Sequence, residues 1–404
     1  MVYRTLYKEH NAASLSSAES LYQSRFDSES SIKWDFHING NPLFCLLTTE
    51  VYQLTEEAHS LEKKIHSLWW SLPSGVIQHY YRSLAIEEVI STNEIENIRS
   101  TRKDIENALD AISLKGTKRF SEISHLYLAL SENEIIFPKT PSDLRKLYDN
   151  LMRGELGKDE ELDGEIFRRD TVEILNQRQE TIHAGFYRES KIIEGVETII
   201  RLEYETPANL VNIMMSHFMF ETIHPFYNGN GRTGRYLLGI QLRNALSPAT
   251  ALTMSTSINE NRREYYKAFQ TVEHRLNRGD GTPFVISMLK LFRAAQEGLI
   301  ESLEIRIDLL QSLEEAIQDL EETQEFKKHQ IRLLYILGQI QLFGKDETLS
   351  LDIATKLLYV SKSTATRYFS ALSELDLVYE VSKRPLRFAL TDKGRTTVGL
   401  DSNI

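Results

Sequence analysis

Residues that could do chemistry are concentrated between positions 224 and 235, where the chain reads HPFYNGNGRTGR. His224 is followed by Pro225, and a proline ring disfavours helical backbone at the residue before it. His224 is therefore predicted at the end of a helix, with its imidazole projecting into a cleft.

The glycines and arginines that follow His224 predict a binding site for an anion. Gly229 and Gly231 let the backbone turn tightly and direct its N–H groups at one point. The next helix is expected to begin there, so its unpaired N–H groups and positive dipole end point at the same place. Arg232 and Arg235 share one face of that helix and can hold further phosphate oxygens. An anion site beside a histidine is typical of phosphoryl or nucleotidyl transfer, and the Gly-Lys-Ser/Thr of a Walker A loop is absent.

The elements that must position this stretch are mostly helices, since apolar side chains recur three and four residues apart. The predicted helices cover residues 51–68, 77–98, 103–112 and 295–325. Thr206-Pro207 is predicted to open the helix that ends at His224, with Thr206 as the N-cap. Strand-like patterns are scarce before residue 340. The best of them, over residues 190–202, predicts a short hairpin.

The last part of the chain has a different composition and a different order of elements. Residues 327–404 contain 12 Lys and Arg against 8 Asp and Glu, so this part is net basic and the rest is strongly acidic. Predicted helices over 331–342, 350–357 and 361–375 precede predicted strands over 377–381 and 386–390. That order is typical of a winged helix-turn-helix. Lys362, Ser363, Thr366 and Arg367 offer donors to DNA, but such domains also bind proteins, and both interpretations stay open.

Composition sets the remaining bounds. With 404 residues the chain is expected to form two or three domains, and its single cysteine, Cys45, excludes a disulfide scaffold and a cysteine-based zinc site. The net charge of −11 argues against a protein that binds nucleic acid with its whole surface. No apolar run is long enough to span a bilayer and no signal peptide is evident, so a cytoplasmic protein without a membrane partner is expected.

The stretch HPFYNGNGRTGR resembles the signature of Fic-domain proteins, HPFx(D/E)GNGRxxR, and departs from it only at Asn228, where the family has an acid. Gly185-Phe186-Tyr187-Arg188 with Ile192 to Gly195 resembles the Fic flap hairpin. NRREYY at 261–266 resembles the segment that closes the nucleotide pocket. TNEIEN at 92–97 resembles the inhibitory motif (S/T)xxxE(G/N).

The resemblance implies a mostly α fold: a Fic-type helical core with a small β-hairpin flap, plus a C-terminal winged helix-turn-helix domain. The expected domains are an N-terminal helical segment (1–75), a Fic domain (76–295) that includes the inhibitory helix (about 85–98), a connector helix (296–326) and the winged helix (327–404).

The resemblance also implies a protein adenylyltransferase, which moves AMP from ATP to a Ser, Thr or Tyr hydroxyl of a target protein or of itself, with Mg²⁺. His224 would be the catalytic base. The positions implied to bind ATP are Gly229, Asn230, Gly231, Arg232, Arg235, Ile192, Ile193, Glu194, Gly195 and Tyr265. Among them, the side chain of Asn230 would add to the phosphate contacts, residues 192–195 would pin the target, and Tyr265 would lie beside the adenine.

Two further positions bear on regulation and on the metal. A carboxylate at Glu96 would compete with the γ-phosphate for Arg235, so the resemblance implies autoinhibition in cis. The family's acid at the position of Asn228 binds Mg²⁺, whereas an asparagine oxygen can ligate a hard cation but brings no charge. Activity is therefore expected to be retained but reduced; a changed nucleotide or metal preference, or nucleotide binding without catalysis, are the alternatives.

Other functions share these residues. A Fic enzyme can use its inhibitory glutamate to remove AMP from a target, and a degenerate Fic core can sense a nucleotide while a winged helix binds DNA as a transcriptional regulator. Phosphate transfer of the Doc type is disfavoured, because that branch has lysine where this chain has Gly229. Fic cores often dimerise, so the resemblance also allows a homodimer, which no stretch of the sequence specifies.

Overall fold

The computed structural model describes residues 3–12, 15–110, 119–132, 135–156, 162–175, 181–344 and 348–400. The chain divides into two compact units. Unit 1 comprises Met1–Lys63 and Leu84–Gly298, and unit 2 comprises Lys64–Ser83 and Leu299–Ile404. Each unit is described by itself below. None of the helices in the described ranges has the length and apolar character needed to cross a membrane.

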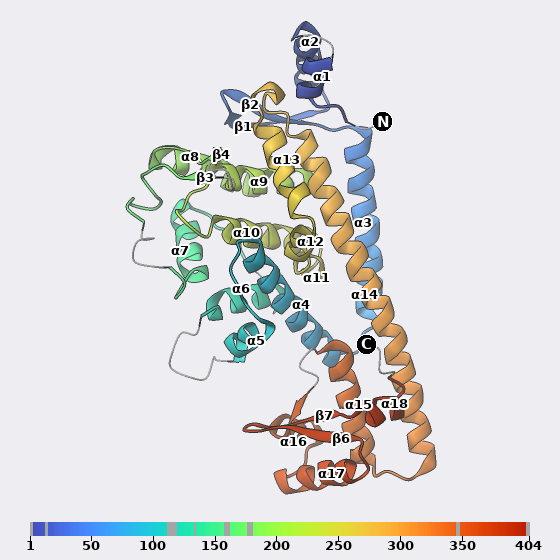
Figure 1. The fold of residues 1–404 in the computed structure, drawn as a ribbon. Coiled ribbons are helices and arrows are strands. Elements are labelled where there is room, and N and C mark those ends of the chain that lie inside the picture. The colour runs from blue at the N-terminus through green and yellow to red at the C-terminus, as the bar shows by residue number, and fades with distance from the viewer. Residues whose placement is uncertain are drawn as a thin grey trace. The chain divides into compact units, whose positions relative to one another are not determined.

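Unit 1 is built mainly from helices, with two small hairpins (Figure 1). Its helices are α1 (Leu6–Ala12), α2 (Leu15–Phe26), α5 (Arg102–Asp110), α6 (Ser121–Glu132), α7 (Pro141–Leu151), α8 (Glu189–Glu205), α9 (Leu210–Ile223), α10 (Asn230–Ala245), α11 (Pro248–Ala251), α12 (Met254–Glu260) and α13 (Arg262–Glu273), with a short 3₁₀ turn, η3 (Arg275–Asn277). Its strands are β1 (Ser31–Ile38), β2 (Asn41–Leu46), β3 (Glu173–Leu175) and β4 (Thr181–Ala184). The helices α3 (Thr49–Trp70), α4 (Ser74–Ile95) and α14 (Thr282–Thr323) contribute residues to both units.

The centre of unit 1 is α9, all of whose residues except Glu221 are buried. A helix that is buried on every side belongs in the middle of a domain, because no face of it needs to meet water. The helices α8 and α10 pack on either side of it (Figure 1). Because His224 follows α9 directly and α10 begins at Asn230, the first half of the HPFYNGNGRTGR stretch (224–229) connects two core helices, and its second half (230–235) begins α10.

The first hairpin of unit 1, β1–β2, was not predicted, and the N-terminal part is therefore not purely helical as expected. Its sequence carries a clear signal: Ile32, Trp34, Phe36 and Ile38 alternate with polar residues, and Asn39-Gly40 has the two positive φ angles of a tight hairpin turn. The strands pair antiparallel, with Ile38 opposite Asn41.

The hairpin predicted over residues 190–202 is wrong, because this segment lies inside α8. Ile192, Val196 and Ile199 are spaced by four and three residues and form the buried face of that helix. A small antiparallel hairpin does precede the HPFYNGNGRTGR stretch, but it is formed by β3 and β4, with Glu173 opposite Ala184. The end of the predicted helix 103–112, residues 111–112, lies outside the described residues.

The predicted start of α9 is also wrong. Thr206 is the C-cap of α8, and its hydroxyl donates to the carbonyl of Leu202 at 2.5 Å. The N-cap of α9 is Asn209, whose side chain accepts a hydrogen bond from the backbone N–H of Asn212 at 2.9 Å. An asparagine three residues after a threonine competes for the same capping role, and here it caps the helix.

Unit 2 contains the helices and strands predicted for the C-terminal part, in the predicted order. Its elements are α15 (Lys328–Phe343), β5 (Leu349–Ser350), α16 (Leu351–Leu358), α17 (Lys362–Glu374), β6 (Val378–Lys383), β7 (Leu386–Leu390) and α18 (Asp392–Thr397). The three strands form an antiparallel sheet in the order β5-β7-β6. Phe369 of α17 stacks on Phe388 of β7 at 3.9 Å between ring centroids, which joins helix and sheet in one core.

The helix α14 begins earlier than the predicted connector and is continuous from Thr282 to Thr323. Within unit 2, Leu303 and Leu313 of this helix are buried. A side chain at Gly338 of α15 would meet Leu313 at 2.6 Å, so the glycine permits close packing there.

A buried carboxylate in unit 1 gives the fold a pH dependence. Glu88 of α4 accepts hydrogen bonds from the N–H groups of Ser255 and Thr256, at 2.7 and 3.4 Å, in the first turn of α12. Burial raises the pKa of Glu88 to about 7. The hydrogen bonds lower the pKa, but by less than burial raises it. Between pH 4.5 and about 7 the folded protein therefore keeps a proton that the unfolded chain has released.

We predict that Glu88→Gln flattens this dependence. In the parent protein this carboxyl makes the folded state less stable as pH rises through the window, by up to about 3 kcal/mol. The variant should therefore gain melting temperature relative to the parent at about pH 7.5 but not at about pH 5. Glu87→Gln, at a partly exposed neighbouring carboxylate paired with Arg102, is the control. Equal gains at both pH values for Glu88→Gln would contradict the assignment.

Candidate active site

His224 lies where the sequence predicts it, directly after the last residue of α9. Its φ of 52° is left-handed, which ends the helix, and its backbone N–H still bonds to the carbonyl of Phe220. The ring Nδ1 is 3.3 Å from the carbonyl oxygen of Glu221. A carbonyl oxygen can only accept, so Nδ1 carries the proton in this contact and Nε2 carries the lone pair. That tautomer can take a proton from a substrate.

A residue that the sequence analysis missed, Arg168, fixes the turn at His224. Its buried guanidinium donates to the carbonyls of His224, Asp170 and Ile223, at 2.8, 2.5 and 3.3 Å. Burial lowers the pKa of Arg168, while the charges of nearby acidic groups oppose that shift. A cation at the end of α9 also complements the negative end of the helix dipole. Arg168 is thus a positioning residue for His224.

The loop that precedes α10, residues 225–229, is where the sequence predicts an anion site, and we call it the anion loop. Hydrogen bonds and one ring contact hold it in place. Gly229 has a φ of +76° and precedes the first turn of α10, as the two-glycine pattern predicts. The side chain of Asn230 accepts from the N–H of Phe226 at 2.9 Å and donates to its carbonyl at 2.7 Å. The ring of Phe226 stacks on Tyr148 of α7 at 3.6 Å. The Asn230 amide therefore holds the loop in this structure, where a phosphate contact was predicted.

Arg235 and Glu96 meet in the structure. The Arg235 guanidinium donates to Glu96 Oε1 at 2.7 Å and to the side-chain and backbone oxygens of Thr92, at 2.7 and 3.1 Å. Burial is the largest single effect on the pKa of Arg235 and lowers it, but the charges of Glu96, Tyr265 and Glu221 and the hydrogen bond to Glu96 together raise it by more, so the guanidinium stays charged. A side chain at Gly231 would come within 2.0 Å of Glu96 Oε1. The carboxylate therefore lies against the first turn of α10, where a bound anion would interact with the helix N-terminus.

Arg232 is held by a second carboxylate that the sequence did not point to. Its Nη1 is 2.6 Å from Oε2 of Glu155, and each side chain is only 5% exposed. Glu155 lies in the turn after α7, separated from Arg232 by 77 positions. Within one motif, both arginines thus pair with carboxylates from elsewhere in the chain.

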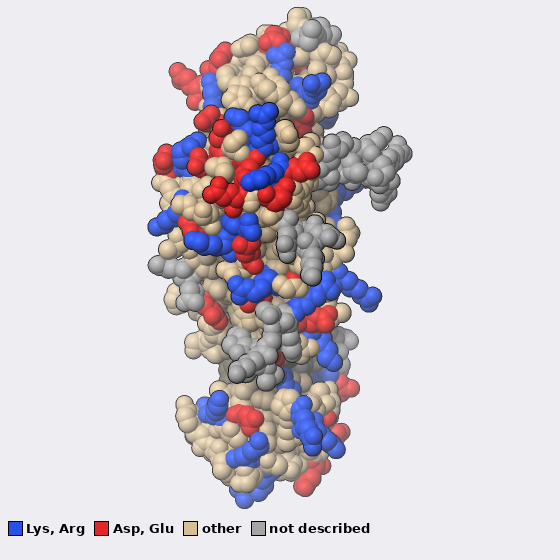
Figure 2. Space-filling view, turned by 90° about the vertical axis from the view of Figure 1, so that its left-hand side faces the viewer, with Lys and Arg blue, Asp and Glu red and all other residues tan. Residues whose placement is uncertain are grey.

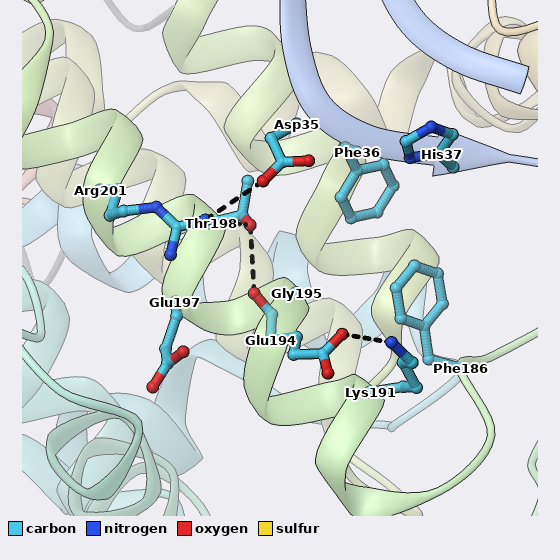
Figure 3. A pocket seen from close by; sticks show the side chains of 10 residues that line it. All are labelled: Asp35, Phe36, His37, Phe186, Lys191, Glu194, Gly195, Glu197, Thr198 and Arg201. Carbon is cyan, nitrogen blue, oxygen red and sulfur yellow. Dashed lines mark hydrogen bonds and ion pairs between the residues drawn. The ribbon is translucent and has the colours of Figure 1, made fainter.

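The four residues predicted to bind ATP at positions 192–195 belong to the helix α8, not to the strand-like flap that was predicted. Ile192 is buried in the core, whereas Glu194 and Gly195 line a pocket of about 480 Å³ between β1 and α8. Figure 3 shows Glu194 paired with Lys191 on the wall of this pocket. Contact between any of the four, Ile193 included, and a nucleotide stays a prediction.

Tyr265 is a core residue in this structure. Its hydroxyl lies 2.8 Å from Nε2 of His217, and both rings are buried. Burial and the charge of Arg235 lower the pKa of His217 to about 3, so this histidine is neutral. Its Nε2 therefore accepts a hydrogen bond from the hydroxyl of Tyr265. The neighbouring Tyr266 is 46% exposed and is the ring of this pair that faces solvent. The adenine contact proposed for Tyr265 stays untested.

The residues near the loop do not form a metal cage by themselves. Asn228 is exposed and offers one neutral oxygen, and the described residues contain no group of three or more His, Cys, Asp and Glu side chains suited to a metal. A Mg²⁺ ion that arrives on nucleotide phosphates needs fewer protein ligands than a resident ion does. Asn228 therefore fits, at most, as one ligand to a nucleotide-borne metal.

Part of the chain matches a known family. Residues 138–242, which run from α7 to α10, match the Fic/DOC family. The motif and this match together identify residues 138–242 as a Fic domain. Glu96 and Tyr265 lie outside the matched residues.

Individual relatives are adenylyltransferases. The "Protein adenylyltransferase Fic" of Drosophila willistoni is 27% identical over 210 residues, which cover 52% of this chain and 38% of that protein. The protein of the same name from Drosophila mojavensis is 27% identical over 252 residues, 59% of this chain and 46% of that protein. The matches thus span less than half of each relative. A Fic family protein from Desulfovibrio desulfuricans G20 has the same fold, with a TM-score of 0.52, 20% identity, and coverage of 85% of this chain and 97% of that one.

We predict that Gly185→Ala disturbs the contacts by which Arg168 holds His224 in place. A methyl group there would lie 2.3 Å from Nη2 of Arg168 and 3.0 Å from Cβ of His224, so the guanidinium must move from its carbonyl partners. Thermal unfolding should report a loss on the order of 2 kcal/mol. Gly298→Ala, in open space on α14, should be neutral or slightly stabilising. Similar melting of the two variants would show that Arg168 does not depend on this space.

Proposed function

We propose that this chain is a protein adenylyltransferase that transfers AMP from ATP to a hydroxyl group of a target protein or of itself. The observation that carries the proposal is a histidine whose Nδ1 meets a carbonyl oxygen, which leaves Nε2 to hold the lone pair of the neutral ring, six residues before a helix N-terminus that bears two buried arginines. A base beside an anion site suits attack of a hydroxyl on a phosphate. The adenylyltransferase relatives support the choice of AMP as the transferred group.

In the proposed reaction His224 Nε2 accepts the proton of the attacking hydroxyl. The hydroxyl oxygen then bonds to the α-phosphorus, and the bond from that phosphorus to the bridging oxygen of the β-phosphate breaks, releasing pyrophosphate. Backbone N–H groups at Gly229 to Gly231 and the guanidinium groups of Arg232 and Arg235 would stabilise the negative charge. Mg²⁺, when bound with the nucleotide, would neutralise part of the phosphate charge.

We further propose that Glu96 restrains this reaction in cis. The carboxylate holds Arg235, and it lies against Gly231 at the start of α10. A γ-phosphate that needs the same guanidinium must displace it. Because the Arg235 side chain is 2% exposed, its charge always requires an anionic partner, so the carboxylate and a phosphate are alternatives.

The reverse reaction is the second candidate. The Glu96 side chain is 30% exposed although its partner is buried, so the carboxylate can reach water and Arg235 at once. A carboxylate in that position could orient a water for attack on an adenylylated side chain. Incubation with a pre-adenylylated protein separates the two: loss of AMP that depends on Glu96 would favour removal over transfer.

For unit 2 we propose a winged-helix module that mediates interactions. Ser361 caps α17, and Lys362 at its start is paired with Asp352 at 3.0 Å, which leaves less positive charge for DNA. Acidic and basic side chains are interspersed on the molecular face drawn in Figure 2. A protein partner therefore fits this module better than DNA does, and DNA binding by a transcriptional regulator is the alternative.

We predict that Glu96→Gly increases automodification with labelled ATP by about tenfold or more, since a change of 1.4 kcal/mol in nucleotide placement suffices for that factor. Glu94→Gly, which puts the same glycine two residues earlier beside an exposed pair with Arg262, is the matched control and should label like the parent. Equal labelling of the Glu96→Gly variant and the parent would show that Glu96 does not restrain the reaction.

A second prediction concerns the metal position. Asn228→Asp adds a charged oxygen ligand, so it should raise labelling and lower the Mg²⁺ concentration needed for half-maximal labelling, both with and without Glu96→Gly. We expect measurable labelling in Glu96→Gly alone. If only the variants that carry Asn228→Asp label any protein, the natural chain binds nucleotide without transferring it.

A further inference from the structure

The turn after α7 places an acidic side chain directly on the anion loop. Helix α7 ends at Leu151 with Met152 as its C-cap, and Gly154 turns the chain with a φ of +80°. The N–H of Glu155 then bonds to the carbonyl of Met152 at 3.0 Å. A side chain at Gly229 would meet the Met152 sulfur at 2.6 Å, so this turn rests on the loop itself.

The contact between Glu155 and Arg232 is buried but uses only one atom of each group. Glu155 Oε2 meets Arg232 Nη1 at 2.6 Å. Among the residues that the structure describes, Glu155 Oε1 and Arg232 Nε are buried and have no hydrogen-bond partner. Arginine and carboxylate commonly join through two parallel hydrogen bonds, and buried charged groups left half-satisfied are costly. This pair therefore makes only one of the two parallel hydrogen bonds that a guanidinium and a carboxylate can form.

We propose that Glu155 is a second restraint on nucleotide binding, which occupies Arg232 as Glu96 occupies Arg235. The inference rests on the proposed function only in taking a nucleotide's phosphates as the competing anion. A phosphate offers several oxygens to a guanidinium, so it can engage Nε as well as Nη1 and satisfy the atom that the carboxylate leaves unpaired.

The two carboxylates together reduce the positive charge that the two arginines give the site. Two arginines face two glutamates, so an approaching triphosphate finds little net positive charge until a carboxylate withdraws. Glu96 follows α4 and Glu155 follows α7, so different segments carry the two restraints and each can be released without the other. ATP affinity is thus expected to depend on both.

A different role predicts the opposite result. If Glu155 only orients Arg232 for its phosphate, removing the carboxylate would weaken nucleotide binding. If it competes with the phosphate, removing it would strengthen binding. Equilibrium binding therefore separates competition from orientation, and it does so without any transfer reaction.

The experiment is calorimetric titration of the full chain with ATP and with pyrophosphate. Glu155→Gln should bind each about tenfold more tightly than the parent, and the double variant with Glu96→Gln more tightly than either single variant. Glu155→Asp, which keeps the charge but shortens the side chain, should lie between. The control is Glu122→Gln, because Glu122 pairs at 3.3 Å with Arg153 of the same turn but is more exposed.

Unchanged or weaker binding by both Glu155 variants, with folding confirmed by circular dichroism, would overturn the inference. If Glu96→Gln alone tightens binding, the proposed function survives that result. If no variant binds ATP or pyrophosphate, the inference and the proposed function both fail. Tighter binding by Glu122→Gln equal to that by Glu155→Gln would also overturn it, because the effect would then be one of net charge.

Discussion

The structure of the site depends on the buried charge of Arg235. A guanidinium that is almost fully removed from water must have an anionic partner, and Glu96 at the end of α4 provides it. This pair fixes the end of α4 against the first turn of α10, with Thr92 as a further acceptor. The same requirement links fold to function, because any anion that replaces Glu96 at Arg235 must also replace its stabilising contact. The neighbouring helix N-terminus favours an anion, and a nucleotide phosphate is the one proposed here.

The rest of unit 1 holds the two ends of the HPFYNGNGRTGR stretch in place. His224 follows the last residue of the buried helix α9, and Arg168 donates hydrogen bonds to the carbonyls at the end of that helix. Helix α10 begins directly after Gly229. Between them, Phe226 is fixed by the Asn230 amide. His224 is therefore held mainly by Arg168 and the anion loop mainly by Asn230, although the backbone N–H of Arg168 also bonds to the carbonyl of Pro225 in the loop. A change at either arginine's carboxylate partner is expected to alter nucleotide binding while leaving His224 in position.

Local sequence signals predicted the parts of the site that are local. The His-Pro pair gave the end of α9, and the two glycines gave the start of α10. The hairpin β1–β2 was available from the alternation that ends at Asn39-Gly40 and was overlooked, whereas the strand predicted near Ile192 ignored a stronger helical spacing. Arg168 and Glu155 could not be predicted in this way, because each meets its partner across a long stretch of chain and no local pattern marks it.

The central claim is that the chain transfers AMP with His224 as the base, at a site that Glu96 restrains. The most direct test is intact-protein mass spectrometry of the Glu96→Gly chain after incubation with Mg²⁺ and each nucleoside triphosphate in turn. The account predicts an added mass of one AMP with ATP, and its loss when His224→Ala is introduced as well. Addition of a phosphate, addition that survives His224→Ala, or no addition with any nucleotide would contradict it.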